Sequence, residues 1–412
     1  MDQDPASVRL FHVATVPLSL WYLLVGQIGF MKSRGLEVHA LAAPGELLDA
    51  LADREGIPVH AVDMQRQVTP FRDLVSLVQI WRTFRRIRPH IVHAQTPKGG
   101  LLGSLGAWLA MVPVRIYHIR GLPYMTATGW KRRLLRLTER VACACAHQVL
   151  CVSHTLRQIA ISEGFCPAGK ISTLLKGSSN GVDASGKYNP ARVPAEERDR
   201  TRARYGIPAD AQVVGFVGRI VRDKGLTELV EAWQALREEW PRLHLLIVGP
   251  FESEDPVPPE VEKALRYDPR IHLVGADWNT PPLYRAMDLV ALPTYREGCP
   301  NVLLEASAME LPVVATRIPG CVDVVEDGET GLLVPAHDAP ALSEALRRYL
   351  NDPSLGRRHG RAGRERVLRD FATEQVWEAL YEQYMSMVRA KGLRTPEVAL
   401  PDQGGDAAHV DC

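Results

Sequence analysis

The chain has 412 residues, of which 46% are hydrophobic and 24% are charged. This length exceeds one ordinary core and predicts two domains, and the composition excludes a disordered or fibrous protein. Residues 1–184 carry 21 Lys and Arg against 12 Asp and Glu, so the net charge of +1 conceals a first half at +9 and a remainder at −8. A basic half suits an anionic partner such as a phospholipid surface or a phosphorylated substrate, although a basic face that only maintains solubility has the same composition.

The cysteines and the start of the chain indicate where the protein resides. The seven cysteines include no C-x-x-C pair and no zinc-spaced histidines, which favours reduced, cytoplasmic thiols. Residues 1–7 contain two acids and no basic segment, so no signal peptide is expected. Residues 10–30 lack charged side chains and have the length of a membrane span. Because Pro17 interrupts them, we interpret them as a strand followed by a helix.

In the first half, short apolar runs alternate with amphipathic ones. The predicted strands are residues 9–15, 37–42, 59–62, 91–93, 114–118, 149–152 and 171–174. The predicted helices between them include residues 19–34, 71–87, 98–111, 130–145 and 155–163. This alternation predicts a parallel, doubly wound sheet.

Residues 181–200 are polar and contain prolines, which is typical of a linker between domains. Alternation then resumes, with predicted strands 212–217, 243–248, 271–274, 289–292 and 313–316 and predicted helices 226–240, 302–309, 339–350, 354–369 and 373–389. We therefore predict domains at 1–184 and 185–394 and a disordered tail at 395–412. Two Rossmann-like α/β domains would face each other across a cleft at the carboxyl ends of their strands. A single-ligand Rossmann protein with a regulatory domain fits the same pattern.

The strongest chemical signal is the segment YREGCPNVLLE at residues 295–305. Glu297 follows a predicted strand, and Glu305 lies one turn into the next helix. The first amides of that helix, from Asn301, Val302 and Leu303, form an anion site suited to a phosphate. Glu305 is placed to reach a hydroxyl group near that phosphate. Taken alone, such a glutamate pair more often belongs to a solvated helix surface.

A second signal, GFVGRIVRDKG at residues 215–225, follows the first strand of the second domain. Gly218 permits close approach of a ligand to the backbone. Arg219 and Lys224 bring two cations to the same edge, where they could neutralise a departing diphosphate without a metal ion. The segment differs from the G-x-G-x-x-G fingerprint, which disfavours an NAD enzyme. A basic turn without function is the alternative for this segment alone.

Together the two segments resemble the family-4 glycosyltransferases, which have the two-domain GT-B fold, a G-R-x5-K-G type loop and an E-x7-E motif. SSNGVD at 178–183 and EDGETGLLVP at 326–335 extend the resemblance. It implies a retaining transferase that needs no metal or cofactor and takes a sugar from a nucleotide diphosphate donor, most simply a UDP-sugar. The implied roles are leaving-group stabilisation by Arg219 and Lys224, sugar orientation by Glu297 and ribose binding by Glu305. Gly218, Cys299, Asn301, Val302 and Leu303 complete the implied donor site.

The first domain departs from the family pattern at its predicted acceptor edge. Many relatives carry a Gly-Gly turn after the first strand, where this chain has VPLS ending at Ser19. Many also place a His before a Gly at a position that Arg120 holds here, with His118 on the same strand face. We expect Ser19, His118, Arg120 and Lys98 to be candidates for acceptor contacts. A structural role for His118 is equally compatible with the sequence.

Cations concentrate at residues 82–88 and 131–140, the latter interleaved with leucines in WKRRLLRLTERV. Such a helix suits an anionic bilayer and resembles that of bacterial enzymes that extend lipid-linked glycans for capsule, exopolysaccharide or O-antigen. We therefore expect a polyprenyl-diphosphate-linked acceptor and a cytoplasmic protein attached peripherally to the inner face of the membrane. A packing helix with a solvated basic side is the alternative. A nonenzymatic nucleotide-sugar-binding subunit and a sugar-nucleotide epimerase remain the functional alternatives.

Overall fold

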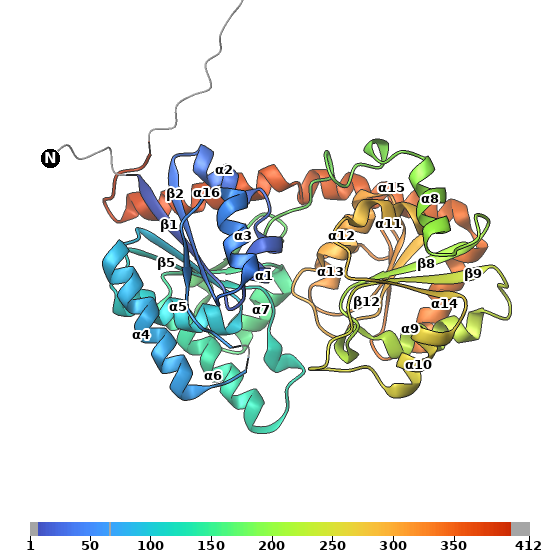
Figure 1. Cartoon of the computed structure of the whole chain (residues 1–412), viewed down its shortest axis with the longest axis horizontal. Helices are drawn as coiled ribbons and strands as arrows, with labels where there is room; N and C mark the ends of the chain where they lie inside the picture. Colours follow the sequence, from blue (N-terminus) through green and yellow to red (C-terminus); the bar gives the residue numbers. More distant parts are fainter. Residues whose placement is uncertain (1–6, 66, 397–412) are drawn as a thin grey trace, which may run out of the picture.

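The computed structural model describes residues 7–65 and 67–396, which form two α/β domains side by side (Figure 1). The tail predicted at 395–412 lies almost wholly outside the described residues. The first domain holds a seven-stranded parallel sheet in the order β3-β2-β1-β4-β5-β6-β7, and the second holds a six-stranded parallel sheet in the order β10-β9-β8-β11-β12-β13. The predicted doubly wound architecture is confirmed in both halves.

The elements of the first domain follow the predicted alternation. Its strands are β1 (Val8–Val13), β2 (Leu36–Ala42), β3 (Val59–Ala61), β4 (Ile91–Gln95), β5 (Val114–Ile119), β6 (Gln148–Cys151) and β7 (Ile171–Thr173). Its helices are α1 (Pro17–Leu23), α2 (Gln27–Ser33), α3 (Glu46–Glu55), α4 (Pro70–Ile87), α5 (Pro97–Leu109), α6 (Gly129–Cys145) and α7 (His154–Ser162), with short 3₁₀ turns at Pro123–Met125 and Ala168–Lys170. The apolar segment 10–30 is a strand and two short helices, as the interruption at Pro17 predicted. No helix among the described residues is long and apolar enough to cross a membrane.

The second domain begins with a 3₁₀ turn at Pro190–Arg192 and with a helix that starts inside the predicted linker. Its strands are β8 (Gln212–Val217), β9 (Leu243–Val248), β10 (Ile271–Gly275), β11 (Leu289–Leu292), β12 (Val313–Thr316) and β13 (Leu332–Val334). Its helices are α8 (Glu196–Arg204), α9 (Leu226–Leu236), α10 (Pro259–Tyr267), α11 (Thr280–Ala286), α12 (Asn301–Ala308), α13 (Cys321–Val324), α14 (Ala339–Asn351) and α15 (Pro353–Asp370), with a 3₁₀ turn at Arg222–Lys224. The edge strand β13 was not predicted.

Alternate residues of the first sheet point to cores on its two faces. Leu10 and Ile116 belong to a buried cluster that includes residues of α1 to α3, whereas Phe11 packs with α4 and α5 and Tyr117 packs with α6. The faces of a strand alternate with a period of two. Residues 12, 118 and 120 therefore lie on the same side of the sheet as Leu10 and Ile116.

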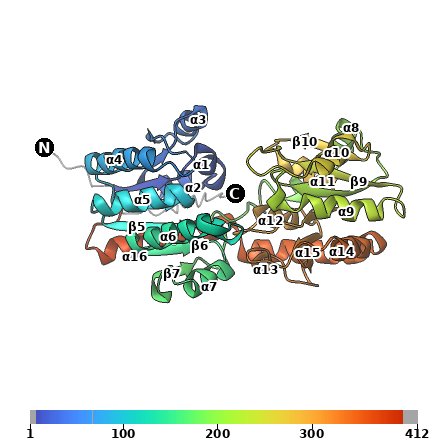
Figure 2. The same ribbon diagram turned by 90° about the horizontal axis from the view of Figure 1, so that it is seen from below.

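The last helix, α16 (Thr373–Ala390), belongs to the first domain although it follows the second in sequence. Leu380, Tyr384 and Val388 are buried in the same cluster as Leu10. Figure 2 shows α16 lying along the first domain. The predicted assignment of residues 185–394 to the second domain is wrong for this helix. Its apolar face is buried in the core of the first domain.

The chain crosses between the domains twice, and the two crossings are bonded to each other. Val182 donates to the Phe371 carbonyl at 2.9 Å, and the indole of Trp377 donates to Asn180 at 2.7 Å. Gly181 has φ +68°, and a Cβ there would lie 2.6 Å from the Cα of Thr373. A glycine is therefore required where the crossings touch.

Candidate active site

The carboxyl ends of the two sheets meet, and the donor motif of the second domain lies at their junction. Gly298, between β11 and α12, packs so closely on the loop after β5 that a Cβ there would lie 2.0 Å from the Arg120 carbonyl oxygen. Thr155 of α7 donates its amide to Asp323 of α13 at 3.1 Å. These contacts join the two edges that the sequence predicts to form the site.

The two donor-motif loops of the second domain hold each other in place. The amide of Tyr295 and the hydroxyl of Thr294 both donate to the Asp223 carbonyl, at 2.8 and 3.1 Å. Gly225 has φ +69°, and a Cβ there would lie 1.9 Å from the Pro293 carbonyl oxygen. Only a glycine fits at this point, so the backbone next to Lys224 can lie directly against the loop that carries Glu297.

Each cation of the predicted donor site is paired with a carboxylate. Lys224 forms an ion pair with Glu297, and both side chains are largely buried. Arg219, which follows Gly218 at the end of β8, pairs with Glu252 at 2.6 Å, with half of its side chain exposed. No motif in the sequence marks Glu252 as a partner of Arg219. Lys224 has three N–H donors, so it can retain Glu297 while also contacting an anion.

Glu305, the second glutamate of the E-x7-E motif, is held by a tyrosine that was not predicted from the sequence. The hydroxyl of Tyr284, on α11, donates to Glu305 at 2.9 Å. Burial raises the pKa of Glu305, and the hydrogen bond from Tyr284 opposes that rise. No local motif marks a tyrosine as the partner of a distant glutamate, so the sequence alone does not single out Tyr284.

The start of α12 differs in one respect from the predicted anion site. The amide of Leu303 donates to the Pro300 carbonyl at 3.0 Å, so it already has a partner. The predicted anion donors are thereby reduced to Asn301 and Val302, because Pro300 turns the chain tightly into the helix. Cys299 packs against buried clusters of both domains, and burial raises the pKa of its thiol to about 12.

Two of the predicted acceptor residues are placed differently from the expectation. Lys98, in the first turn of α5, forms an ion pair with Asp73 of α4 at 2.8 Å and is 11% exposed, so it is not a free cation at the edge. His118 is buried and lies 3.1 Å from His93, ring nitrogen to ring nitrogen. Desolvation and the nearby Arg120 hold the pKa of His118 well below its usual range. His118 therefore has a supporting position beneath the edge.

The other two predicted acceptor residues do lie at the junction or close to it. Ser19 is half-buried in the first turn of α1, directly after β1. Arg120 follows β5 and donates a hydrogen bond from Nη2 to Gln95 at the end of β4. Strands β1 and β4 are neighbours at the point where the strand order reverses, which is where open α/β sheets bind ligands.

Comparison with known proteins identifies the family. The model of the glycosyl transferase 4-like domain matches residues 29–175, and that of glycosyl transferases group 1 matches residues 211–352. The chain is also 33% identical over 381 residues to the capsular polysaccharide biosynthesis glycosyltransferase CapM of Staphylococcus aureus, covering 92% of this chain and 98% of that one. The chain is a family-4 glycosyltransferase. The protein is therefore a transferase, rather than a nonenzymatic nucleotide-sugar-binding subunit or a sugar-nucleotide epimerase.

More distant relatives agree with this assignment. The chain is 23% identical over 363 residues to the UDP-Gal:alpha-D-GlcNAc-diphosphoundecaprenol alpha-1,3-galactosyltransferase of Escherichia coli, covering 86% of this chain and 91% of that one. The structure of Anabaena HepE in complex with UDP and glucose superposes with a TM-score of 0.76 at 19% identity, covering 92% of this chain and all of that one. A glycosyltransferase from Rickettsia africae gives the same TM-score and identity, covering 93% of this chain and 99% of that one. The structural likenesses confirm the GT-B fold.

Proposed function

We propose that this glycosyltransferase transfers a sugar from a UDP-sugar, with retention of anomeric configuration, to a polyprenyl-diphosphate-linked glycan during synthesis of a cell-surface polysaccharide. The proposal depends chiefly on one observation, which is that Lys224, Glu297 and the start of α12 lie together where the two domains meet. The names of the relatives support the substrate classes. The Escherichia coli relative is named for a UDP-Gal donor and a diphosphoundecaprenol acceptor, and the Staphylococcus aureus relative for capsule synthesis.

The donor diphosphate would be bound by Arg219, Lys224 and the amides of Asn301 and Val302. Preorganised cations and amides stabilise the charge that develops on a leaving diphosphate. Glu305 would accept a hydrogen bond from the ribose, and Gly218 and Cys299 would line the donor site. Among the described residues no group of three His, Cys, Asp or Glu side chains is placed to hold a metal ion. We propose that these cations take the part of a divalent ion.

Glu297 would orient the transferred sugar rather than attack it. Its carboxylate is paired with Lys224, which lowers its nucleophilicity and fixes its position. The motif supplies no other carboxylate beside the reacting carbon. We therefore favour attack by the acceptor hydroxyl on the face from which the diphosphate departs, with the acceptor proton passing to a departing diphosphate oxygen.

The acceptor would reach this site from a membrane surface formed by α4, α5 and α6, where α5 contacts both of its neighbours. Eleven of the sixteen exposed large apolar side chains of the described residues lie between residues 68 and 137. On α4 they form a stripe that faces solvent, with Phe71 89% and Leu74 61% exposed. A monomeric soluble protein seldom exposes such a patch.

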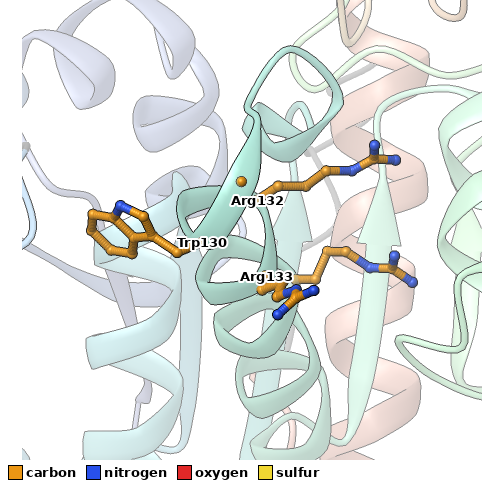
Figure 3. Close-up of a pocket in the computed structure, with 5 residues that line it drawn as sticks. Trp130, Arg132 and Arg133 are labelled. Carbon is orange, nitrogen blue, oxygen red and sulfur yellow. The ribbon is translucent and has the colours of Figure 1, made fainter.

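A basic hollow of about 600 Å³ opens at the start of α6 and is lined by Gly129, Trp130, Arg132, Arg133 and Arg136. Trp130 leaves α6 on the opposite side from Arg132 (Figure 3). Arg136 is paired with Glu163, so its charge is already partly balanced. A hollow of arginines beside exposed apolar residues suits the phosphates and the upper acyl chains of anionic lipids.

The membrane part of the proposal is tested by sedimentation with anionic liposomes at low salt. Replacement of Lys131, Arg132, Arg133 and Arg136 by Gln should abolish binding, because each exposed cation contributes about 1 kcal/mol. The matched control replaces four exposed cations of the second domain by Gln, which are Arg204, Arg357, Arg358 and Arg361. Equal sedimentation of both variants would contradict a membrane surface on α6 and favour a water-soluble acceptor.

The donor is tested by calorimetric titration of UDP- and GDP-sugars, followed by proton NMR of the product. We expect a UDP-sugar to bind and the product to keep the configuration of the donor. Inversion at the anomeric carbon would overturn the retaining mechanism. Binding of GDP-sugars alone would overturn the choice of nucleotide.

A further inference from the structure

The guanidinium of Arg120 is buried and has no counter-ion among the described residues. Nε and Nη1 are buried without a hydrogen-bond partner, and only Nη2 is bonded, to the Gln95 side chain. No salt bridge in the described part of the chain includes Arg120. A buried charge without a partner is costly, so this position requires an explanation.

Two other arginines show how this protein normally buries a guanidinium. Arg202 of α8 is fully buried, and its three nitrogens donate to three carbonyls and to Asp288. Arg115, near the start of β5, donates to the carbonyls of Cys145 and Val112 at 2.7 and 2.9 Å. Arg120 is the contrasting case, with two nitrogens free.

The side chains around Arg120 add a further donor and no negative charge. Arginine has only donors, so Gln95 must present its oxygen to Arg120 and its NH₂ to Nδ1 of His12, 3.0 Å away. Desolvation lowers the pKa of His12 to about 3, so the ring is neutral and carries its proton on Nε2. That nitrogen is also buried without a partner. His93 and His118 are kept neutral by burial in the same layer.

Three nitrogens without a partner, Nε and Nη1 of Arg120 and Nε2 of His12, thus lie near the carboxyl ends of β5 and β1, with no acceptor supplied by the described residues. Such a set of donors is complementary to the oxygens of an oxyanion. The hydroxyl of Tyr384, on α16, forms a hydrogen bond of 2.5 Å with Nδ1 of His93, beneath the layer that contains His93 and His118. The backbone of Arg120 contacts Gly298, next to Glu297, so a group bound here would lie close to the transferred sugar.

We propose that Arg120 and His12 form an oxyanion subsite in the first domain that binds a carboxylate or phosphate group carried by a sugar substrate. The inference depends on the proposed function in placing a sugar here. The subsite is separate from the donor diphosphate site, whose cations belong to the second domain. Two sources of the oxyanion are open to the test, namely the carboxylate of an acidic sugar and the phosphate of a phosphorylated substrate.

The experiment uses the full chain carrying Arg219→Ala and Lys224→Ala, so that phosphate binding at the second domain is removed. Thermal unfolding is measured with methyl phosphate, with methyl glucuronide and with sodium chloride at equal ionic strength. We expect one of the two oxyanions to raise Tm above the chloride value. The effect should disappear when Arg120→Met is added and should persist when Arg115→Met is added instead.

The probe that raises Tm identifies the source, methyl phosphate for a phosphorylated substrate and methyl glucuronide for an acidic sugar. The proposal is overturned if neither probe acts, or if Arg120→Met leaves the effect unchanged. Should Arg120→Met fail to fold, the Nε–H resonance of Arg120, assigned with Arg120→Lys, must shift on addition of the active probe. The probes contain no nucleotide and no transfer is measured, so the result is independent of the donor assignment.

Discussion

The two sheet edges that meet at the active site treat charge in opposite ways. At the second domain, Lys224 and Arg219 each have a carboxylate partner, and Arg219 is half exposed. At the first domain, Arg120 lies among neutral histidines and has no carboxylate partner within residues 7–65 and 67–396. A cation that is paired with a carboxylate costs little folding free energy while the site is empty. A buried cation without such a partner would gain one when an anionic ligand binds.

The two edges are also held in place by different contacts. The loops of the second domain are bonded to each other through Asp223 and pack through Gly225. The edge of the first domain is supported from below by α16, which closes the histidine layer through Tyr384.

The largest expected effect compares two buried arginines. Arg202→Met removes a fully bonded guanidinium and should lower the free energy of unfolding by about 3 kcal/mol, because it leaves three carbonyls and Asp288 without that partner. Arg120→Met should leave the free energy of unfolding unchanged or raise it, since an unpaired charge is removed. Urea unfolding followed by tryptophan fluorescence measures both. A greater loss from Arg120→Met would mean that Arg120 is stabilised within the protein.

Removal of either leaving-group cation should have the next largest effect. Lys224→Ala and Arg219→Ala should each lower transfer by on the order of 10²-fold, the usual scale for loss of a preorganised charge contact. Thermal melts recorded beside the rate assays control for folding. Near-normal rates in both variants would remove the diphosphate role from the second-domain edge.

The two motif glutamates should differ in what their removal affects. Glu305→Gln should weaken donor binding by roughly 1.5 to 3 kcal/mol, the scale of a charged hydrogen bond, whereas Glu297→Gln should slow turnover more than it weakens binding. Donor titrations combined with single-turnover rates separate the two effects. The reverse pattern would exchange the roles of the two residues.

The smallest expected effect is that of a chelator. Transfer should continue in excess EDTA, because Arg219, Lys224 and the start of α12 are proposed to balance the diphosphate charge. The measurement is the transfer rate before and after EDTA, and again after Mg²⁺ or Mn²⁺ is restored. Complete loss that either ion reverses would contradict the leaving-group proposal, whereas modest stimulation by Mg²⁺ would not.

The sequence predicted the parts of this protein that local patterns encode. Strands and helices have short periods, so twelve strands, among them β8 and β11, were predicted at nearly their observed positions. Arg219, Lys224, Glu297 and Glu305 could be selected as candidates because two short motifs carry them. The return of α16 to the first domain was missed, because an amphipathic helix does not encode which core it joins.

Contacts between distant residues account for the remaining errors. Lys98 was expected at the edge, but Asp73 binds it from a helix that comes earlier in the sequence. Tyr284 and Glu252 entered the site only once the fold brought them beside Glu305 and Arg219. Arg120 was selected from its motif position, yet its lack of a counter-ion became visible only when all of its neighbours were known.

The division of labour between the two edges is tested most directly by calorimetric titration of UDP into three proteins, the wild type, Lys224→Met and Arg120→Met. Lys224→Met should weaken UDP binding by about tenfold or more, in line with loss of one charged contact worth roughly 1.5 to 3 kcal/mol. Arg120→Met should bind UDP as the wild type does, because its guanidinium is assigned to a sugar-borne oxyanion. Unchanged affinity in Lys224→Met together with a loss in Arg120→Met would contradict a donor site built on the second domain.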